Sequence, residues 1–255
     1  MTPLTPQQVA ALREIVELWA ETPFVLIGAS ALGCWVDMHW RQTHDLDLSV
    51  ACDMAAFPAG LDKLAGWKRA SGREHSWTSA AGVRFDVLPA GRALLRQGYV
   101  EWPAGGRMSL VGFRLAFEHA EPVNVSRGLT IPVAPLHVLL LLKMVSFLDR
   151  PVARERDLAD LALVLKEGVP IEDRFTEETI ARNIDVWVAG AFLLGRRLAG
   201  IINASERRSA IEFLRKLRDP RDTDRARLRS LRASRLAEDE LDALWDGFAV
   251  GLGSP

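Results

Sequence analysis

The chain has 255 residues, of which 49% are hydrophobic and 25% charged, which is enough for one large domain or two modest ones. The 32 basic residues nearly balance the 33 acidic ones, so the chain as a whole is not a basic nucleic-acid binder. The longest strongly apolar run, VLLLL at 138–142, is too short to cross a bilayer, and residues 1–16 lack the pattern of a signal peptide. With Cys34 and Cys52 as the only cysteines, we expect no disulfide framework and a cytoplasmic location.

The first half of the chain predicts a mixture of helices and strands. Thr5, Pro6 and Gln8 form the pattern of a capped helix start, which predicts a helix over 6–20. The apolar spacing then predicts, in order, a strand at 24–28, a helix at 29–40, a strand at 44–50, a hairpin of 75–79 with 83–89, and strands at 109–117 and 129–134.

The second half predicts helices. Segments 136–148 and 155–167 have helical apolar spacing, and the helix-breaking Pro151 lies between them. From 176 onward the pattern is helical except at 218–230. We therefore predict an α+β fold with a mixed sheet and flanking helices in a domain at 1–134, followed by a helical domain at 135–255.

Two aspartates with one residue between them, Asp45 and Asp47, form the polar side of a predicted strand whose other side is apolar. A strand alternates faces and advances about 3.3 Å per residue, so both carboxylates project the same way, roughly 6–7 Å apart. Asp86, in a predicted neighbouring strand, faces away from the apolar Val83, Phe85 and Val87. Three such carboxylates would suit Mg²⁺, although isolated aspartates of this kind are also ordinary surface or capping groups.

A strand–glycine–helix unit precedes the aspartates. A helix that starts after Gly28 leaves unpaired N–H groups and a positive dipole end, an arrangement that binds phosphate, and Ser30 adds a hydroxyl. The alternative is a tight turn with small residues for packing. Lys143 lies within an apolar helical stretch, where it either contacts an anion or pairs with Asp157 or Asp160.

These segments resemble a known family. Gly28-Ala29-Ser30-Ala31-Leu32 followed by Arg41-x-Thr43-x-Asp45-Leu46-Asp47-Leu48 resembles the first motif of the DNA polymerase β-like nucleotidyltransferases. More narrowly it resembles the AbiEii-type (type IV toxin, MenT-like) enzymes, with Gly-Gly-Thr-Ala-Leu and then Arg-x-Ser/Thr-x-Asp-hydrophobic-Asp. Segments 139–150 and 155–165 resemble that family's lysine helix and the helix after it. Ala29 departs from the family, which commonly has Gly or Ser there.

The resemblance implies a polymerase β-like fold, with the catalytic domain at 1–134 and the helical domain at 135–255 completing its active-site cleft. It also implies a site for NTP and two Mg²⁺ ions. It implies that Asp45, Asp47 and Asp86 bind the metal ions and that Lys143 contacts the nucleotide phosphates. The remaining nucleotide-binding residues that we expect are Gly28, Ala29, Ser30, Arg41, Thr43, Asp157 and Asp160. From its own position, Arg41 is equally able to contact phosphate or to neutralise Asp45.

A local excess of basic residues lies between Arg207 and Arg235. It predicts either a solvated helix face with salt bridges or a docking surface for RNA phosphates, with Arg225, Arg227 and Arg229 as the residues that test the second. The scattered histidines show no zinc-binding spacing.

The sequence therefore predicts an Mg²⁺-dependent nucleotidyltransferase that acts on an acceptor hydroxyl. By resemblance, that acceptor is a tRNA 3′ end and the protein is the toxin of a toxin–antitoxin pair, with an antitoxin partner. The alternatives are nucleotidylation of a small molecule or a protein by the same fold, and a non-catalytic nucleotide-binding or antitoxin-like module.

Overall fold

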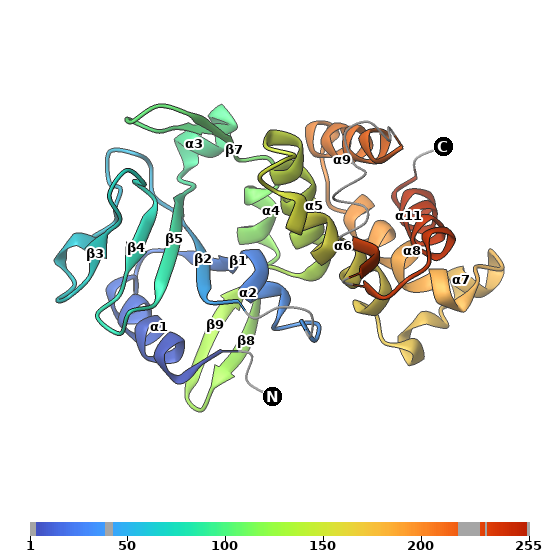
Figure 1. Cartoon of the computed structure of the whole chain (residues 1–255), viewed down its shortest axis with the longest axis horizontal. Coiled ribbons are helices and arrows are strands. Elements are labelled where there is room, and N and C mark those ends of the chain that lie inside the picture. The colour runs from blue at the N-terminus through green and yellow to red at the C-terminus, as the bar shows by residue number, and fades with distance from the viewer. Residues whose placement is uncertain (1–3, 39–42, 219–229, 233, 254–255) are drawn as a thin grey trace. The chain divides into compact units, whose positions relative to one another are not determined.

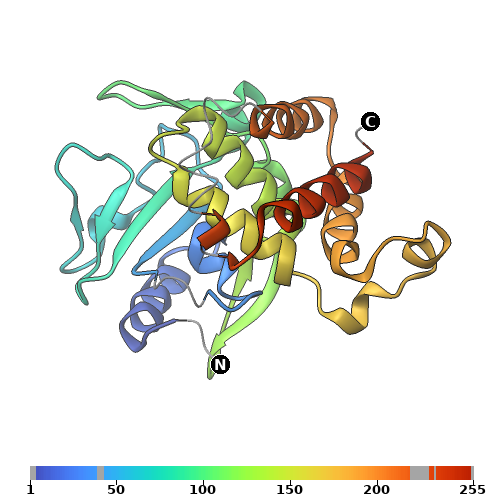
Figure 2. The same cartoon turned by 45° about the vertical axis from the view of Figure 1, so that its right-hand side comes forward.

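The computed structural model describes residues 4–38, 43–218, 230–232 and 234–253. The backbone divides into two compact units, Met1–Pro135 and Leu136–Pro255. Among the described residues, all strands belong to the first unit, and the second consists of helices and turns (Figures 1 and 2). The catalytic role predicted for 1–134, and the completion of its cleft by 135–255, stay predictions.

A seven-stranded mixed sheet forms the centre of the first unit (Figure 1). Its strand order is β3-β4-β5-β2-β1-β9-β8. The central strand β2 pairs antiparallel with β1 and parallel with β5, while β9 pairs parallel with β1. Apolar side chains of the central strands form the core, and Leu26, Leu46, Leu48, Phe85 and Val87 are fully buried. The predicted mixed sheet with flanking helices is confirmed.

The first unit contains nine strands and four α-helices in the described part of the chain. In chain order its elements are α1 (Pro6–Leu18), β1 (Phe24–Ile27), α2 (Gly28–Leu32), β2 (Asp45–Val50), η1 (Leu61–Lys63), β3 (Lys68–Arg69), β4 (Ser76–Thr78), β5 (Arg84–Pro89), α3 (Arg92–Gln97), β6 (Tyr99–Glu101), β7 (Arg107–Ser109), α4 (Phe113–Glu118), β8 (Glu121–Ser126) and β9 (Leu129–Val133). The short strands β6 and β7 form a separate two-stranded sheet.

Local sequence signals account for most of these elements. Helix α1 begins at Pro6 and has the predicted capping box, because Thr5 accepts a hydrogen bond from the Gln8 backbone and the Gln8 side chain accepts one from the Thr5 backbone. The predicted hairpin is confirmed as β4 paired antiparallel with β5.

Two predictions in this unit were wrong. The helix expected over 29–40 ends at Leu32 with Gly33 as its C-cap, residues 33–36 form turns and a bend, and residues 39–40 of that prediction lie outside the described residues. The strand expected over 109–117 is mostly helix α4, because Gly112, at a φ of 87°, starts a helix that buries Phe113, Leu115 and Ala116. Apolar residues at that spacing fit a short helix as well as a strand.

The second unit consists of helices packed around an apolar core. In chain order its described elements are α5 (Leu136–Asp149), α6 (Glu155–Glu167), η2 (Ile171–Arg174), α7 (Glu177–Ala181), α8 (Val186–Ala199), α9 (Ala204–Leu217) and α11 (Glu238–Leu252). The bounds of α5 and α6 confirm the two helices predicted on either side of Pro151. None of the helices in the described ranges is long and apolar enough to cross a membrane.

Candidate active site

Strand pairing brings the predicted carboxylates to one polar face of the sheet. In the parallel pair of β2 and β5, Asp47 lies beside Asp86 and Asp45 lies beside Arg84. Residues two apart in a strand share a face, so all four side chains lie on the same side. The Asp45 end of this face is half-exposed, and the face becomes buried further along β2, where Ser49 is fully buried.

An arginine links two of the three carboxylates. Arg84 Nη2 lies 2.5 Å from Asp45 Oδ2 and 3.7 Å from Asp86 Oδ2. The side chains of Arg84 and Asp45 are 44% and 38% exposed, so solvent screens this ion pair and reduces its contribution to stability. The repulsion between carboxylates on adjacent strands is thus partly neutralised from within the sheet.

A buried serine orients the third carboxylate. Ser76, on β4, lies beside Asp86 in the β4–β5 register and is fully buried. Its hydroxyl donates a hydrogen bond of 2.5 Å to Asp86 Oδ1. Because one oxygen is held by Ser76, Asp86 turns the other, Oδ2, toward Arg84 and the polar face.

The glycine after β1 lies directly against Asp47. Gly28 has a φ of 71°, which L-residues rarely adopt, and a Cβ at this position would overlap the Asp47 carboxylate. Strand β1 ends at Ile27, which is opposite Asp47 in the antiparallel pair. Glycine is therefore required at position 28, because the backbone there has a positive φ and the Asp47 carboxylate lies too close to leave room for a Cβ.

The other predicted nucleotide-binding residues of this unit lie close to the same strand. Ala29 and Ser30 are buried, and the Ser30 hydroxyl donates to the Asp45 backbone carbonyl at 2.6 Å, which ties α2 to β2. Thr43 precedes β2, and its carbonyl accepts a hydrogen bond from Gln8. Arg41 lies outside the described residues.

In the second unit, Lys143 forms a buried ion-pair cluster with two aspartates. Its Nζ lies 2.8 Å from Asp157 Oδ1 and 2.7 Å from Asp160 Oδ2, and Asp160 is fully buried. Burial alone would lower the pKa of Lys143, but the charges of Asp157 and Asp160 outweigh it, so the pKa is raised. The predicted pairing within the chain is present; the predicted contact with nucleotide phosphates stays a prediction.

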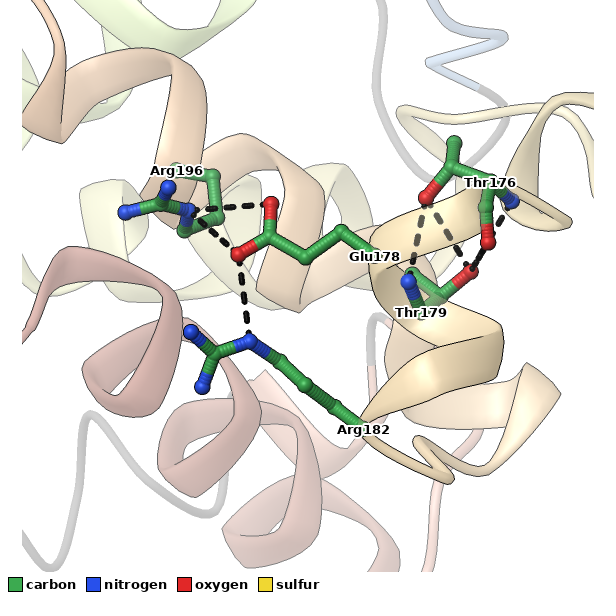
Figure 3. A network of polar contacts seen from close by, with 5 residues as sticks. All are labelled: Thr176, Glu178, Thr179, Arg182 and Arg196. Atoms are coloured by element: carbon green, nitrogen blue, oxygen red, sulfur yellow. Dashed lines mark hydrogen bonds and ion pairs between the residues drawn. The ribbon is translucent and has the colours of Figure 1, made fainter.

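A second charged network in this unit is exposed. Glu178 of α7 forms ion pairs with Arg182 and with Arg196 of α8 at 3.1 and 3.0 Å, as Figure 3 shows. Thr176 and Thr179 form the capping box of α7 beside it (Figure 3). Both arginines pair with the same carboxylate, and the Arg196 pair joins α7 to α8, which is a structural role.

The basic segment between Arg207 and Arg235 is described only in part. Arg207 donates to the Leu252 carbonyl at 2.5 Å and to the Ala199 carbonyl at 3.5 Å, so it caps the ends of α11 and α8. Arg225, Arg227 and Arg229 lie outside the described residues. RNA binding by this segment stays a prediction.

Neither cysteine is suited to nucleophilic catalysis. Burial raises the pKa of the Cys34 thiol to about 11. Burial, and secondarily the charge of Asp53, raises the pKa of Cys52 to about 11. Both side chains therefore remain thiols at neutral pH, and the thiolate is the reactive form.

The carboxylate set fits a divalent cation in its chemistry but not in its present arrangement. Carboxylate oxygens are the ligands that Mg²⁺ prefers. Within the described ranges, however, no three His, Cys, Asp or Glu side chains form a group that could hold a metal ion as they stand. Arg84 lies between Asp45 and Asp86, so the structure shows the donors together with a counter-ion of the chain's own.

Sequence reasoning missed Arg84 and Ser76. Arg84 lies two residues before Asp86 and therefore on the same face of its strand, a signal that was present in the sequence. That it stands beside Asp45 depends on the register between β2 and β5, which no local pattern supplies. Ser76 gave no signal that distinguished it from other strand serines.

Comparison with known proteins gives one family match. Residues 10–254 match the family described as "Nucleotidyl transferase AbiEii toxin, Type IV TA system". A search of curated protein sequences gives no match. Among solved structures, a crystal structure described as a nucleotidyltransferase from H. pylori has 12% identity and a TM-score of 0.38, and the match covers 98% of this chain and 96% of that chain. At that TM-score the likeness bears on neither fold nor activity.

Proposed function

This chain belongs to the AbiEii family of nucleotidyltransferase toxins, and on that premise we propose that it transfers a nucleoside monophosphate from an NTP to an acceptor hydroxyl. The reaction releases pyrophosphate and depends on Mg²⁺. The observation that carries the proposal is the register that places Asp47 beside Asp86, on the same face as Asp45. Three carboxylates on adjacent strands are the donor set that such chemistry requires.

Asp45, Asp47 and Asp86 would hold two Mg²⁺ ions. When bound, the ions would lower the pKa of the acceptor hydroxyl and stabilise the charge on the departing pyrophosphate. We assign assistance in deprotonating the acceptor hydroxyl to Asp86, whose carboxylate Ser76 holds in place through Oδ1. Gly28 fixes the position of Asp47 by leaving room for its carboxylate.

The start of α2 would contact the triphosphate through its backbone. The Ser30 hydroxyl is committed to the Asp45 carbonyl, so we assign this role to the N–H groups of Gly28, Ala29 and Ser30. In this arrangement Ala29, which lacks the hydroxyl of a serine, reduces triphosphate binding little, because its backbone N–H makes the contact. Electrostatic positioning would then account for most of the catalysis.

We further propose an RNA acceptor, namely a tRNA 3′ end, and an antitoxin as the cellular counterpart of this protein. The family description, which names a type IV toxin–antitoxin system, supports the second. The basic segment between Arg207 and Arg235 is the candidate RNA-binding region.

Incubation of the purified protein with α-labelled NTPs, Mg²⁺ and total RNA tests the proposal. We expect label in RNA with the wild type and with Asp62→Asn, which changes an exposed aspartate of η1, and none with Asp47→Asn. Label in a small molecule or in protein would keep the transferase and replace its acceptor. Equal labelling by wild type and Asp47→Asn would overturn the assignment of the site.

A further inference from the structure

We propose that Arg84 is a built-in counter-ion that a divalent cation must displace from Asp45 and Asp86, so that this arginine sets the cation affinity of the site. The inference rests on the proposed function, since it concerns the same carboxylates. Nothing in the family motif assigns a role to this residue, which stands outside both the glycine turn and the Asp-x-Asp strand.

The charges on the face match such an exchange. In the β2–β5 register Arg84 stands beside Asp45 and two residues before Asp86, so one positive charge lies among carboxylates on the same face. A guanidinium carries one positive charge, so a divalent cation that takes its place among the carboxylates offsets more of their negative charge than Arg84 does.

The geometry makes the two cations mutually exclusive. Arg84 Nη2 lies 2.5 Å from Asp45 Oδ2, so a cation bound at that oxygen would compete with the guanidinium for it. Asp86 is held by Ser76 through Oδ1, so Oδ2, 3.7 Å from the same guanidinium nitrogen, is the oxygen it offers to the face. A guanidinium and a dication at the same oxygens would also repel each other.

Exposure makes the exchange inexpensive. The Arg84 side chain is 44% exposed, so on release the guanidinium would enter water rather than a buried space. An ion pair at this exposure is weak, and the cation loses little by breaking it. Arg84 is thus suited to hold the carboxylates together in the absence of cation without blocking the site permanently.

Titration with Mn²⁺ in place of Mg²⁺, followed by electron paramagnetic resonance of the free ion, tests this inference on the full chain. The variants are Arg84→Gln, which removes the charge, Arg84→Lys, which keeps it, and Arg69→Gln, a matched change at an exposed arginine of β3 in the same sheet. We expect Arg84→Gln to bind Mn²⁺ on the order of fivefold more tightly than the wild type, and the other two within about twofold of it.

Thermal unfolding gives a second readout, which a merely structural role would not produce. With EDTA, Arg84→Gln should unfold at a lower temperature than the wild type, because its carboxylates lack their counter-ion. With saturating Mn²⁺ that difference should vanish or reverse. Unchanged or weaker Mn²⁺ binding by Arg84→Gln, while Asp47→Asn abolishes binding, would overturn the role of Arg84 and leave the proposed function standing. Absence of Mn²⁺ binding in every protein, with and without NTP, would overturn both.

Discussion

The two units each contain a basic side chain between two aspartates, and the two clusters differ mainly in burial. Arg84 links Asp45 and Asp86 on a half-exposed face of the sheet. Lys143 links Asp157 and Asp160 in the helical core, where all three side chains are less than a tenth exposed. The same charges therefore meet in two different dielectric environments.

This difference decides what each cluster can do. A buried ion pair is hard to separate, because either partner left alone would be an unsolvated charge. An exposed pair separates at little cost, because water replaces the lost partner. The Lys143 cluster thus joins α5 to α6 through buried ion pairs, whereas the pairs of Arg84 are exposed enough to separate, as the cation exchange that we propose requires.

Lys143→Met should give the largest effect on stability. It leaves Asp157 and the fully buried Asp160 without a counter-charge, and we expect a loss of about 3–5 kcal/mol in the free energy of unfolding. Urea denaturation measures it. Arg182→Ala, which breaks an exposed pair with Glu178, is the control and should cost less than about 1 kcal/mol. Equal losses of unfolding free energy in the two variants would contradict the view that burial makes the Lys143 pairs harder to break than the Arg182 pair.

Gly28→Ala should both destabilise the first unit and abolish nucleotidyl transfer. The positive φ and the overlap with the Asp47 carboxylate together predict a loss of about 2–3 kcal/mol. Gly72→Ala is a matched control, since Gly72 has the same φ of 71° but open space at its Cβ. If the two variants lose equal stability and both keep activity, Gly28 does not position Asp47.

Ser76→Ala should have a smaller effect on stability, of about 1–2 kcal/mol, because it removes one hydrogen bond to a carboxylate. It should also weaken Mn²⁺ binding, since Asp86 would lose its fixed orientation. Ser49→Ala removes a hydrogen bond to the Leu88 carbonyl in the same sheet and should leave Mn²⁺ binding unchanged. The two titrations, run side by side, decide whether Ser76 orients the site.

Alkaline pH should weaken the buried cluster, an effect that is absent near neutrality. The raised pKa of Lys143 means that the folded chain holds this proton more tightly than the unfolded chain. The stabilisation is therefore complete below the ordinary lysine pKa of about 10.4 and declines as the pH rises through the higher folded value. Unfolding midpoints from about pH 8 to pH 11 should show this decline in the wild type but not in Lys143→Met. If the midpoints of the two proteins changed in parallel with pH, Lys143 would not be the source of the decline.

The comparison also separates what the sequence could predict from what it could not. The helices around Lys143 followed from apolar periodicity and Pro151, and the hairpin that carries Asp86 followed from two alternating segments around Gly82. These are local signals. The strand wrongly expected at 109–117 shows their limit, because the apolar residues of a short segment fit both the helical and the strand repeat.

The site was predictable in its acidic residues and not in their neighbours. Asp45 and Asp47 share a face by strand geometry alone, and Asp86 was placed opposite its apolar neighbours. The contacts of Arg84 and Ser76 depend on which strands pair and in which register, which is a property of the whole sheet. Arg84, which pairs with Asp45, comes 39 positions after it along the chain.

A crystal structure of the chain grown with Mn²⁺ and a non-hydrolysable NTP analogue tests the central claim most directly. The account predicts anomalous density for Mn²⁺ at Asp45, Asp47 and Asp86, with Arg84 displaced from Asp45 and Lys143 still between Asp157 and Asp160. Mn²⁺ bound elsewhere, with the pair of Arg84 and Asp45 intact, would contradict it.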